Sequence, residues 1–228
     1  MIDGMTKLKK LEGLYRIHED YLSSSESACH KGCATCCTRN VTITSLEGFY
    51  LLENLDEDKR ALALQHIHQQ ADKKRLIPLL TVNAMAQRCV NGEDLPEEEY
   101  DPSWTPCPLL DDDGACSVYA FRPLACRAMV SRNICGVSGE ADMDDILFTV
   151  NNVFMQVLEH MDQGGTLANM MDMLMHLGVD GHLNHYKSHG IHTDPPSSFL
   201  LNQPLSILMV PPEHRAMIKP VIEELQEL

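Results

Sequence analysis

The segment CHKGCATCC at residues 29–37 decides how this chain is organised, because four of its nine residues are cysteines. A second block, CPLLDDDGACSVYAFRPLACR at residues 107–127, begins 70 residues after Cys37 and adds three more cysteines. Short loops of this kind favour metal ligation, because their backbone N–H groups turn inward and donate to the thiolate sulfurs. The two blocks together therefore predict a cysteine-ligated metal centre.

The adjacent pair Cys36–Cys37 bears on how many metal atoms are bound. Neighbouring side chains usually point apart, so both thiolates fit two atoms of a cluster, or two sites, better than one ion. Arg122 and Arg127 flank Cys126, and their charges would offset the negative charge of a thiolate-bound centre. The two arginines could equally form ion pairs with the acidic turn at residues 111–113.

Other roles remain open to the cysteines. Disulfides would need an oxidising compartment, and the total of nine leaves one thiol without a partner. Separate buried thiols are common singly but do not explain four within nine residues. A nucleophilic cysteine with a histidine base is possible, although no local signature marks one. Cys89 stands alone on a predicted helix, and we expect it in the core.

Composition narrows the class of protein. The chain has 228 residues, 44% of them hydrophobic, and a formal net charge of −15. It can bury a core, and without a basic patch no nucleic-acid partner is expected. We see neither an apolar run of about eighteen residues nor a signal-like N-terminus, so we expect no membrane association and a cytoplasmic location. Thiols stay reduced there, which favours metal binding over disulfides.

Hydrophobic periodicity predicts a mainly α protein, a single metal-stabilised helical domain with long cysteine-bearing loops. We divide it into an N-terminal helix at residues 1–24, a metal-binding region at 25–137, and a C-terminal helical region at 138–228 packed on it. Thr44 and Glu47 form a capping-box pattern ahead of an apolar run. Helices are predicted at 5–22, from 45, at 57–75, 78–90, 142–161 and 166–178, and from 211, with short strands possible at 41–44 and 205–210.

The two cysteine blocks, in this order, resemble the CxxxCxxCC family of zinc- or iron-chelating proteins over roughly residues 25–135. Flagellin lysine N-methylases carry a related cysteine arrangement, but this chain lacks a G-x-G-x-x-G loop for a nucleotide cofactor. The resemblance implies a cysteine-bound metal, with an iron–sulfur cluster favoured and zinc as the alternative. The ligands it implies, with Cys135 added by proximity, are Cys29, Cys33, Cys36, Cys37, Cys107, Cys116, Cys126 and Cys135.

The expected function is that of an iron–sulfur protein that transfers electrons or assists a modification enzyme, with Arg122 and Arg127 beside the cofactor. Its partner would be another protein or a redox partner. The alternatives are a zinc-stabilised interaction module without catalytic activity and a protein for metal storage or delivery. Since a shared metal would close a long loop, we expect residues 25–135 to be poorly folded without it.

Two further groups of residues could bind metals. On a helix, His182, His185 and His189 would share one face, as a second metal site, a proton relay or an exposed polar surface. Methionines are abundant after residue 154, and their helical spacing indicates core filling more than a copper site.

Overall fold

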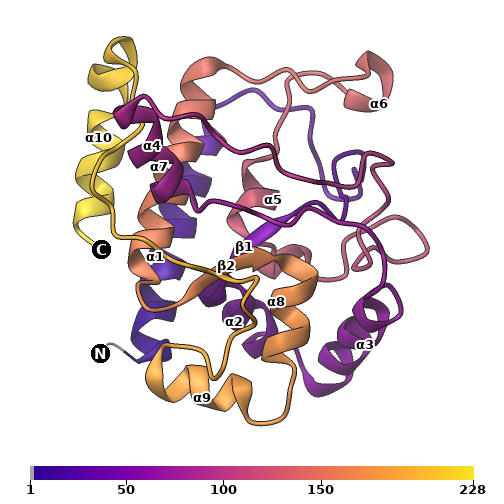
Figure 1. The fold of residues 1–228 in the computed structure, drawn as a ribbon. Helices are drawn as coiled ribbons and strands as arrows, with labels where there is room; N and C mark the ends of the chain where they lie inside the picture. The colour runs from indigo at the N-terminus through magenta and orange to yellow at the C-terminus, as the bar shows by residue number, and fades with distance from the viewer. Residues whose placement is uncertain (1–2) are drawn as a thin grey trace.

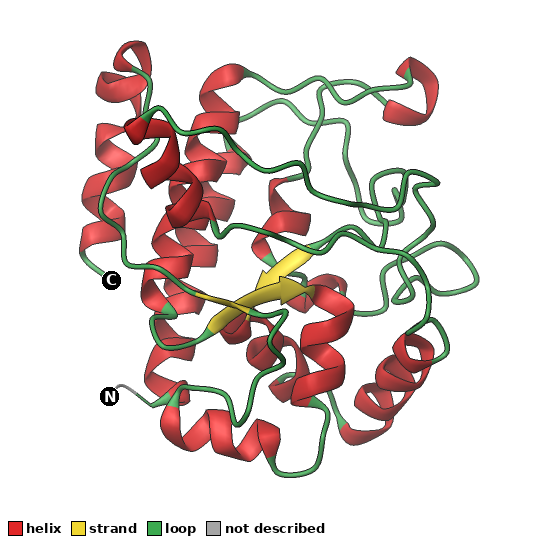
Figure 2. Cartoon of the chain, viewed as in Figure 1, coloured by secondary structure: helices red, strands yellow, loops and turns green. Residues whose placement is uncertain are grey.

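Two long helices, α1 (Gly4–Ser23) and α7 (Asp145–Met161), pack against each other in this computed structural model, which describes residues 3–228. The structure is mostly helical, as predicted, and most helices gather at the left and bottom of the view while long loops fill the upper right, where α6 also lies (Figure 1, Figure 2). Fully buried Leu11 and Phe154 belong to the core between these helices. Within the described residues, no helix is both long and apolar enough to cross a membrane.

A small antiparallel sheet holds the second half of the chain against the first. Its strands lie in the order β1 (Thr42–Thr44), β2 (Thr166–Asn169) and β3 (Leu200–Leu201), with Ile43 opposite Ala168. The predicted strand at 41–44 is therefore present, whereas 205–210 is not a strand and residues 200–201 form the third strand instead. Residues 166–169 were expected to begin a helix, but pairing with both neighbouring strands makes them extended.

Each of the first two strands runs directly into a helix. The predicted capping box is confirmed at the start of α2 (Ser45–Glu53), where Thr44 Oγ1 accepts from Glu47 N and the Glu47 carboxylate accepts from Thr44 N. Helix α8 (Met170–Leu177) is capped by Asn169 and begins four residues after the predicted start at residue 166. Both helices contact each other beneath the sheet, and Met170, Met171 and Met173 are buried in the core, as expected for gap-filling methionines.

The remaining helices are shorter and lie around this centre. Helix α4 begins at Val82 after its cap Thr81, not at Pro78 as predicted, and Gly92 ends it at φ +70°, a conformation that favours glycine. Helix α3 ends at His68, seven residues before the predicted end, and turns follow it. The bounds are α3 (Glu57–His68), α4 (Val82–Asn91), α5 (Leu124–Ala128), α6 (Cys135–Ser138), α9 (His182–His189) and α10 (Arg215–Gln226), with 3-10 turns η1 (Tyr119–Phe121) and η2 (Pro212–His214).

A buried carboxylate, Asp162, ties four parts of the fold together just beyond the end of α7. Its Oδ1 accepts from Lys7 Nζ at 2.9 Å and from the Tyr186 hydroxyl at 2.6 Å. Its Oδ2 accepts from Leu46 N and Asn202 Nδ2, both at 3.0 Å. The carboxylate therefore links α1, the first turn of α2, α9 and the segment after β3.

Candidate metal centre

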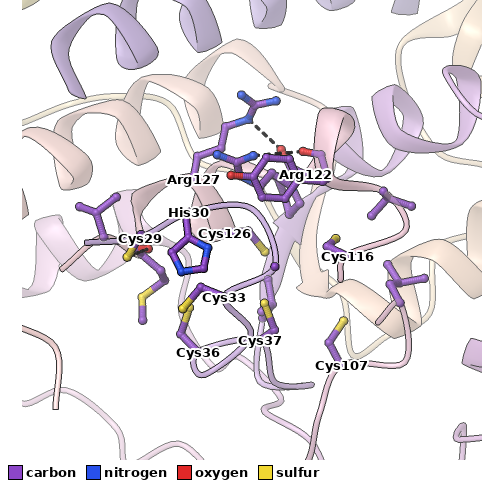
Figure 3. Close-up of a pocket in the computed structure, with 18 of the residues that line it drawn as sticks. Cys29, His30, Cys33, Cys36, Cys37, Cys107, Cys116, Arg122, Cys126 and Arg127 are labelled. Atoms are coloured by element: carbon purple, nitrogen blue, oxygen red, sulfur yellow. Dashed lines mark hydrogen bonds between the residues drawn. The ribbon is translucent and has the colours of Figure 1, made fainter. Parts of the chain in front are cut away.

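One cavity of about 370 Å³ gathers seven of the eight cysteines predicted to bind metal. It lies among the long loops beyond the end of α1, and Figure 3 shows cysteines of the first block on one side of it and Cys107 and Cys116 on the other. The two blocks thus line one common space although they are far apart in sequence. The cysteines in its wall are Cys29, Cys33, Cys36, Cys37, Cys107, Cys116 and Cys126.

Tight turns shape the first block. Cys33 N donates to His30 O and Cys37 N donates to Ala34 O, both at 3.0 Å, so the chain reverses twice within nine residues. Gly32 has φ +94°, which L-residues rarely adopt. These turns present successive thiols to the same cavity, in agreement with the spacing argument.

A backbone hydrogen bond joins the second block to the first, because Cys107 N donates to Cys37 O at 2.9 Å. A tight hairpin follows, in which Asp111 Oδ1 accepts from Ala115 N at 2.7 Å and Leu110 pairs with Cys116. The acidic stretch that looked like a surface turn in the sequence therefore positions Cys116 across from Cys107.

The third cysteine of this block lies on the short helix α5, which Glu47 attaches to the core. Glu47 Oε1 accepts from Leu124 N at 2.7 Å and from the Tyr15 hydroxyl at 3.1 Å. One carboxylate thus caps α2 and also holds the start of the helix that carries Cys126. Sequence analysis identified the capping role of Glu47 but not this second role, since the contact with Leu124 spans 77 residues.

We expect Glu47→Gln to destabilise the protein and to loosen the site. An amide nitrogen cannot accept hydrogen bonds, so two of the buried donors around Glu47 would lose their acceptor, at a cost of about 1–3 kcal/mol. Chemical denaturation should report the lost stability, and bound metal per chain should fall with it. The control is Glu224→Gln at an exposed position of α10, and equal behaviour of both variants would contradict the positioning role.

Burial and proximity alter the acidities of the thiols. Burial raises the pKa of Cys107 to about 11, and burial together with neighbouring thiols raises the pKa of Cys126 further. The Cys37 thiol donates toward the Cys36 sulfur, which lowers the pKa of Cys36 to about 6 and raises the pKa of Cys37. Cys107 and Cys126 are therefore protonated at neutral pH without a cation, so a metal that binds them displaces protons and binds more tightly as pH rises.

The thiols surround the cavity without converging on one point. Among residues 3–228, no three His, Cys, Asp or Glu side chains are already arranged to hold a metal ion. The donor set nevertheless suits a metal, because soft thiolates select zinc and iron–sulfur centres. A cavity of about 370 Å³ is far larger than the roughly 30 Å³ that one water molecule occupies, so ligation of a single ion would require the side chains to rotate inward.

Two cysteines lie outside this cavity. Cys135 begins α6 and its thiol points to Asn133 O at 3.8 Å, near the first block but not in the cavity wall, so its role as a ligand stays a prediction. Cys89 was expected in the core, and this was wrong, because its side chain is exposed. Helix α4 packs on the protein through Asn83 and Ala86, whereas its last turn, which carries Cys89, faces solvent.

Arg122 and Arg127 also line the cavity, and each stacks on a tyrosine. The Arg122 guanidinium lies 3.9 Å from the ring centroid of Tyr119, and that of Arg127 lies 4.2 Å from Tyr15. Arg127 Nε donates to Arg122 O at 2.8 Å (Figure 3). Within residues 3–228 neither arginine has a carboxylate within 4.0 Å, so the alternative of ion pairs with residues 111–113 was wrong.

The late histidines do not form the predicted group of three. His182 turns toward α8, where its Nδ1 lies 2.9 Å from His176 O and its ring lies 4.6 Å from that of His176. His185 instead stacks on His189, with ring centroids 4.3 Å apart. The helix is present, but its first histidine packs inward while the last is exposed at the surface.

The comparisons with known proteins identify the same region. Residues 28–140 match the family model CxxCxxCC, which is described as "Putative zinc- or iron-chelating domain". No curated protein and no solved structure matches the chain. The matched range contains all eight cysteines predicted as ligands and both arginines.

Proposed function

Since the chain belongs through residues 28–140 to the CxxCxxCC family of zinc- or iron-chelating domains, we propose that it holds an iron–sulfur centre and serves in electron transfer or assists a modification enzyme. The observation that carries the proposal is the number of thiols around one space. A structural zinc ion takes four ligands, whereas seven cysteines line this cavity. One iron–sulfur cluster also takes four cysteines, but it is bulkier than a single ion and fills more of the cavity, and the other thiols could hold a second centre or a zinc ion.

The surroundings of the thiols fit a redox role. Cys107 and Cys126 are at least half-buried, and burial together with hydrogen bonds to sulfur sets the potential of a cluster. The cluster would supply one-electron chemistry when bound. The residues of the chain bind it, exclude water from the buried side, and offset its negative charge through Arg122 and Arg127.

A second candidate, the zinc-stabilised interaction module, is favoured by apolar side chains beside the site. Ile134 and Val137, on either side of Cys135, are 64% and 85% exposed, and Met129 at the cavity is 45% exposed. Exposed apolar residues of this kind often mark contact surfaces for a partner.

Analysis of protein purified without oxygen would separate the candidates. We expect a brown protein with iron and acid-labile sulfide, a broad visible absorption band, and an electron paramagnetic resonance signal in one oxidation state. Colourless protein with stoichiometric zinc would support the interaction module and overturn the cluster. Metal that varies between preparations and is removed by mild chelators would indicate storage or delivery.

Matched cysteine variants locate the centre. Cys126→Ser should lose most of the iron and sulfide, whereas Cys89→Ser makes the same chemical change at an exposed position outside the cavity and should retain them. Cys135→Ser tests the eighth predicted ligand directly. Equal metal content in Cys126→Ser and Cys89→Ser would contradict the proposed site.

A further inference from the structure

A second cavity, of about 320 Å³, adjoins the cysteine cavity. Glu19, Tyr119, Arg122 and Arg127 line both spaces, so these side chains form a shared wall. Figure 3 shows both arginines on the side of the cysteine cavity away from Cys36 and Cys37. The second space lies along α1 and contains no cysteine in its wall.

The charges of the second cavity leave a positive excess. Its wall contains three arginines, with Arg16 in addition to the shared pair, and two carboxylates, Glu12 and Glu19. No salt bridge within 4.0 Å joins any of these arginines to a carboxylate in the described part of the chain. In a chain with 33 acidic and only 18 basic side chains, neighbouring guanidinium groups without an acidic partner are available to an external anion.

The shared arginines are held in place before any ligand binds. Arg127 donates through Nε to Arg122 O and through Nη2 to Ala120 O, while Arg122 donates through Nη1 to Tyr119 O. Stacking on Tyr119 and Tyr15 fixes the planes of the two guanidinium groups. Nη1 of Arg127 and the Nε and Nη2 of Arg122 have no partner among residues 3–228 and remain free to donate. Donors that are already oriented lose little entropy when a ligand binds.

Three tyrosines complete the wall, and they indicate that the part of the ligand outside its anionic group is aromatic or apolar. Tyr15, Tyr50 and Tyr119 line a cavity of a size typical of small-molecule sites, and of the three Tyr15 is nearly buried. Tyr15 and Tyr50 pack edge to face with ring centroids 5.5 Å apart, which keeps this surface rigid. Because the wall has an excess of only one positive charge, a monoanion suits it better than a dianion.

We propose that this second cavity binds a small carboxylic acid with an aromatic or apolar body, through the guanidinium groups of Arg122 and Arg127 and the tyrosine rings. A carboxylate offers the two coplanar oxygens that a guanidinium binds in a bidentate manner. The bound acid lies directly beside the cysteine cavity, since both spaces share the same two arginines. Arg122 and Arg127 would also offset the charge of the proposed metal centre, so the affinity for the acid depends on the charge of that centre.

Benzoate is the probe, and its binding to the metal-loaded protein is measured by titration calorimetry. We expect saturable binding that weakens at least tenfold in Arg122→Gln, while the neutral isostere benzamide binds at least tenfold more weakly to the unchanged protein. Arg122→Lys should recover only part of the affinity, because lysine cannot bind bidentately. The control is Arg88→Gln on α4, where the arginine is only loosely paired with Glu93 at 3.8 Å.

A second variant, designed to bind benzoate more tightly, shows whether lost binding in Arg122→Gln is caused by unfolding. Glu12→Gln removes a negative charge from the wall without touching the arginines, so benzoate should bind several-fold more tightly. The proposal is overturned by absence of benzoate binding at millimolar concentration, by equal binding of benzamide, or by unchanged affinity in both Arg122→Gln and Glu12→Gln. Metal and sulfide content measured on the same samples reports separately on the cysteine centre, so failure of one proposal is distinguishable from failure of the other.

Discussion

Removal of the metal is expected to release the cysteine-bearing loops while the helical core stays folded. Structural metal binding supplies roughly 10–16 kcal/mol, more than the typical net stability of about 5–15 kcal/mol for a whole domain. Residues 24–41 and 92–118 have almost no regular secondary structure, and among their apolar side chains mainly Leu109 and Val118 reach the core. Without metal, the main links between the two regions are hydrogen bonds between residues 37–40 and 101–107, including Cys107 N to Cys37 O.

The structure indicates which parts of the chain would lose their order when the metal is removed. Helix α2 lies within residues 25–135, the range that we expected to be poorly folded without metal, yet Leu46, Phe49, Leu51 and Leu52 are fully buried against other helices. Burial of each such side chain contributes about 1.5–3 kcal/mol without any metal. We therefore expect α2 to persist and the disorder to be confined to the loops.

Hydrogen exchange measured by mass spectrometry tests this expectation on protein before and after chelation under reducing conditions. Amides in 24–41 and 92–118 should exchange much faster after chelation, whereas those of α2 and α7 should retain their protection. Cys126→Ser should resemble the chelated protein and Cys89→Ser the loaded one. Identical exchange of the loops in both states would show that the metal does not order them.

Replacement of Asp162 is expected to produce the largest loss of stability of any single substitution considered. Asp162→Ala leaves the buried Lys7 side chain without its carboxylate partner, and its remaining hydrogen bonds go to the carbonyls of Gln163 and Gly190. Breaking a buried ion pair by removal of one partner costs about 3–5 kcal/mol. The Tyr186 hydroxyl and Leu46 N would lose their acceptor as well.

Urea denaturation measures this loss, with the exposed pair Lys219–Glu223 as the reference. Glu223→Ala breaks an ion pair of 3.6 Å whose side chains are mostly exposed, so its effect should stay below about 0.5 kcal/mol. Asp162→Asn keeps the volume and removes the charge, and should fall between the two. A loss for Asp162→Ala no larger than that for Glu223→Ala would mean that the buried pair adds nothing to the fold.

The sequence alone predicts those features of the structure that depend on residues close together in the chain. The capping box of Thr44 and Glu47 and the helical periodicity of α1 and α7 predicted the helices correctly, because these signals depend on residues within a few positions of each other. The cysteine spacing and the family resemblance named eight candidate ligands, and seven of them share one cavity, because short loops with turns bring neighbouring thiols to the same side.

Only the tertiary structure decided the features that depend on distant residues. Strand pairing converted the expected helix start at Thr166 into β2, and the edge of the α4 contact left Cys89 exposed. The second role of Glu47 and the stacking of Arg127 on Tyr15 join residues more than 75 positions apart. The sequence by itself thus determined which residues could bind a metal, whereas burial and packing between remote segments determined how those residues are supported and what lies beside them.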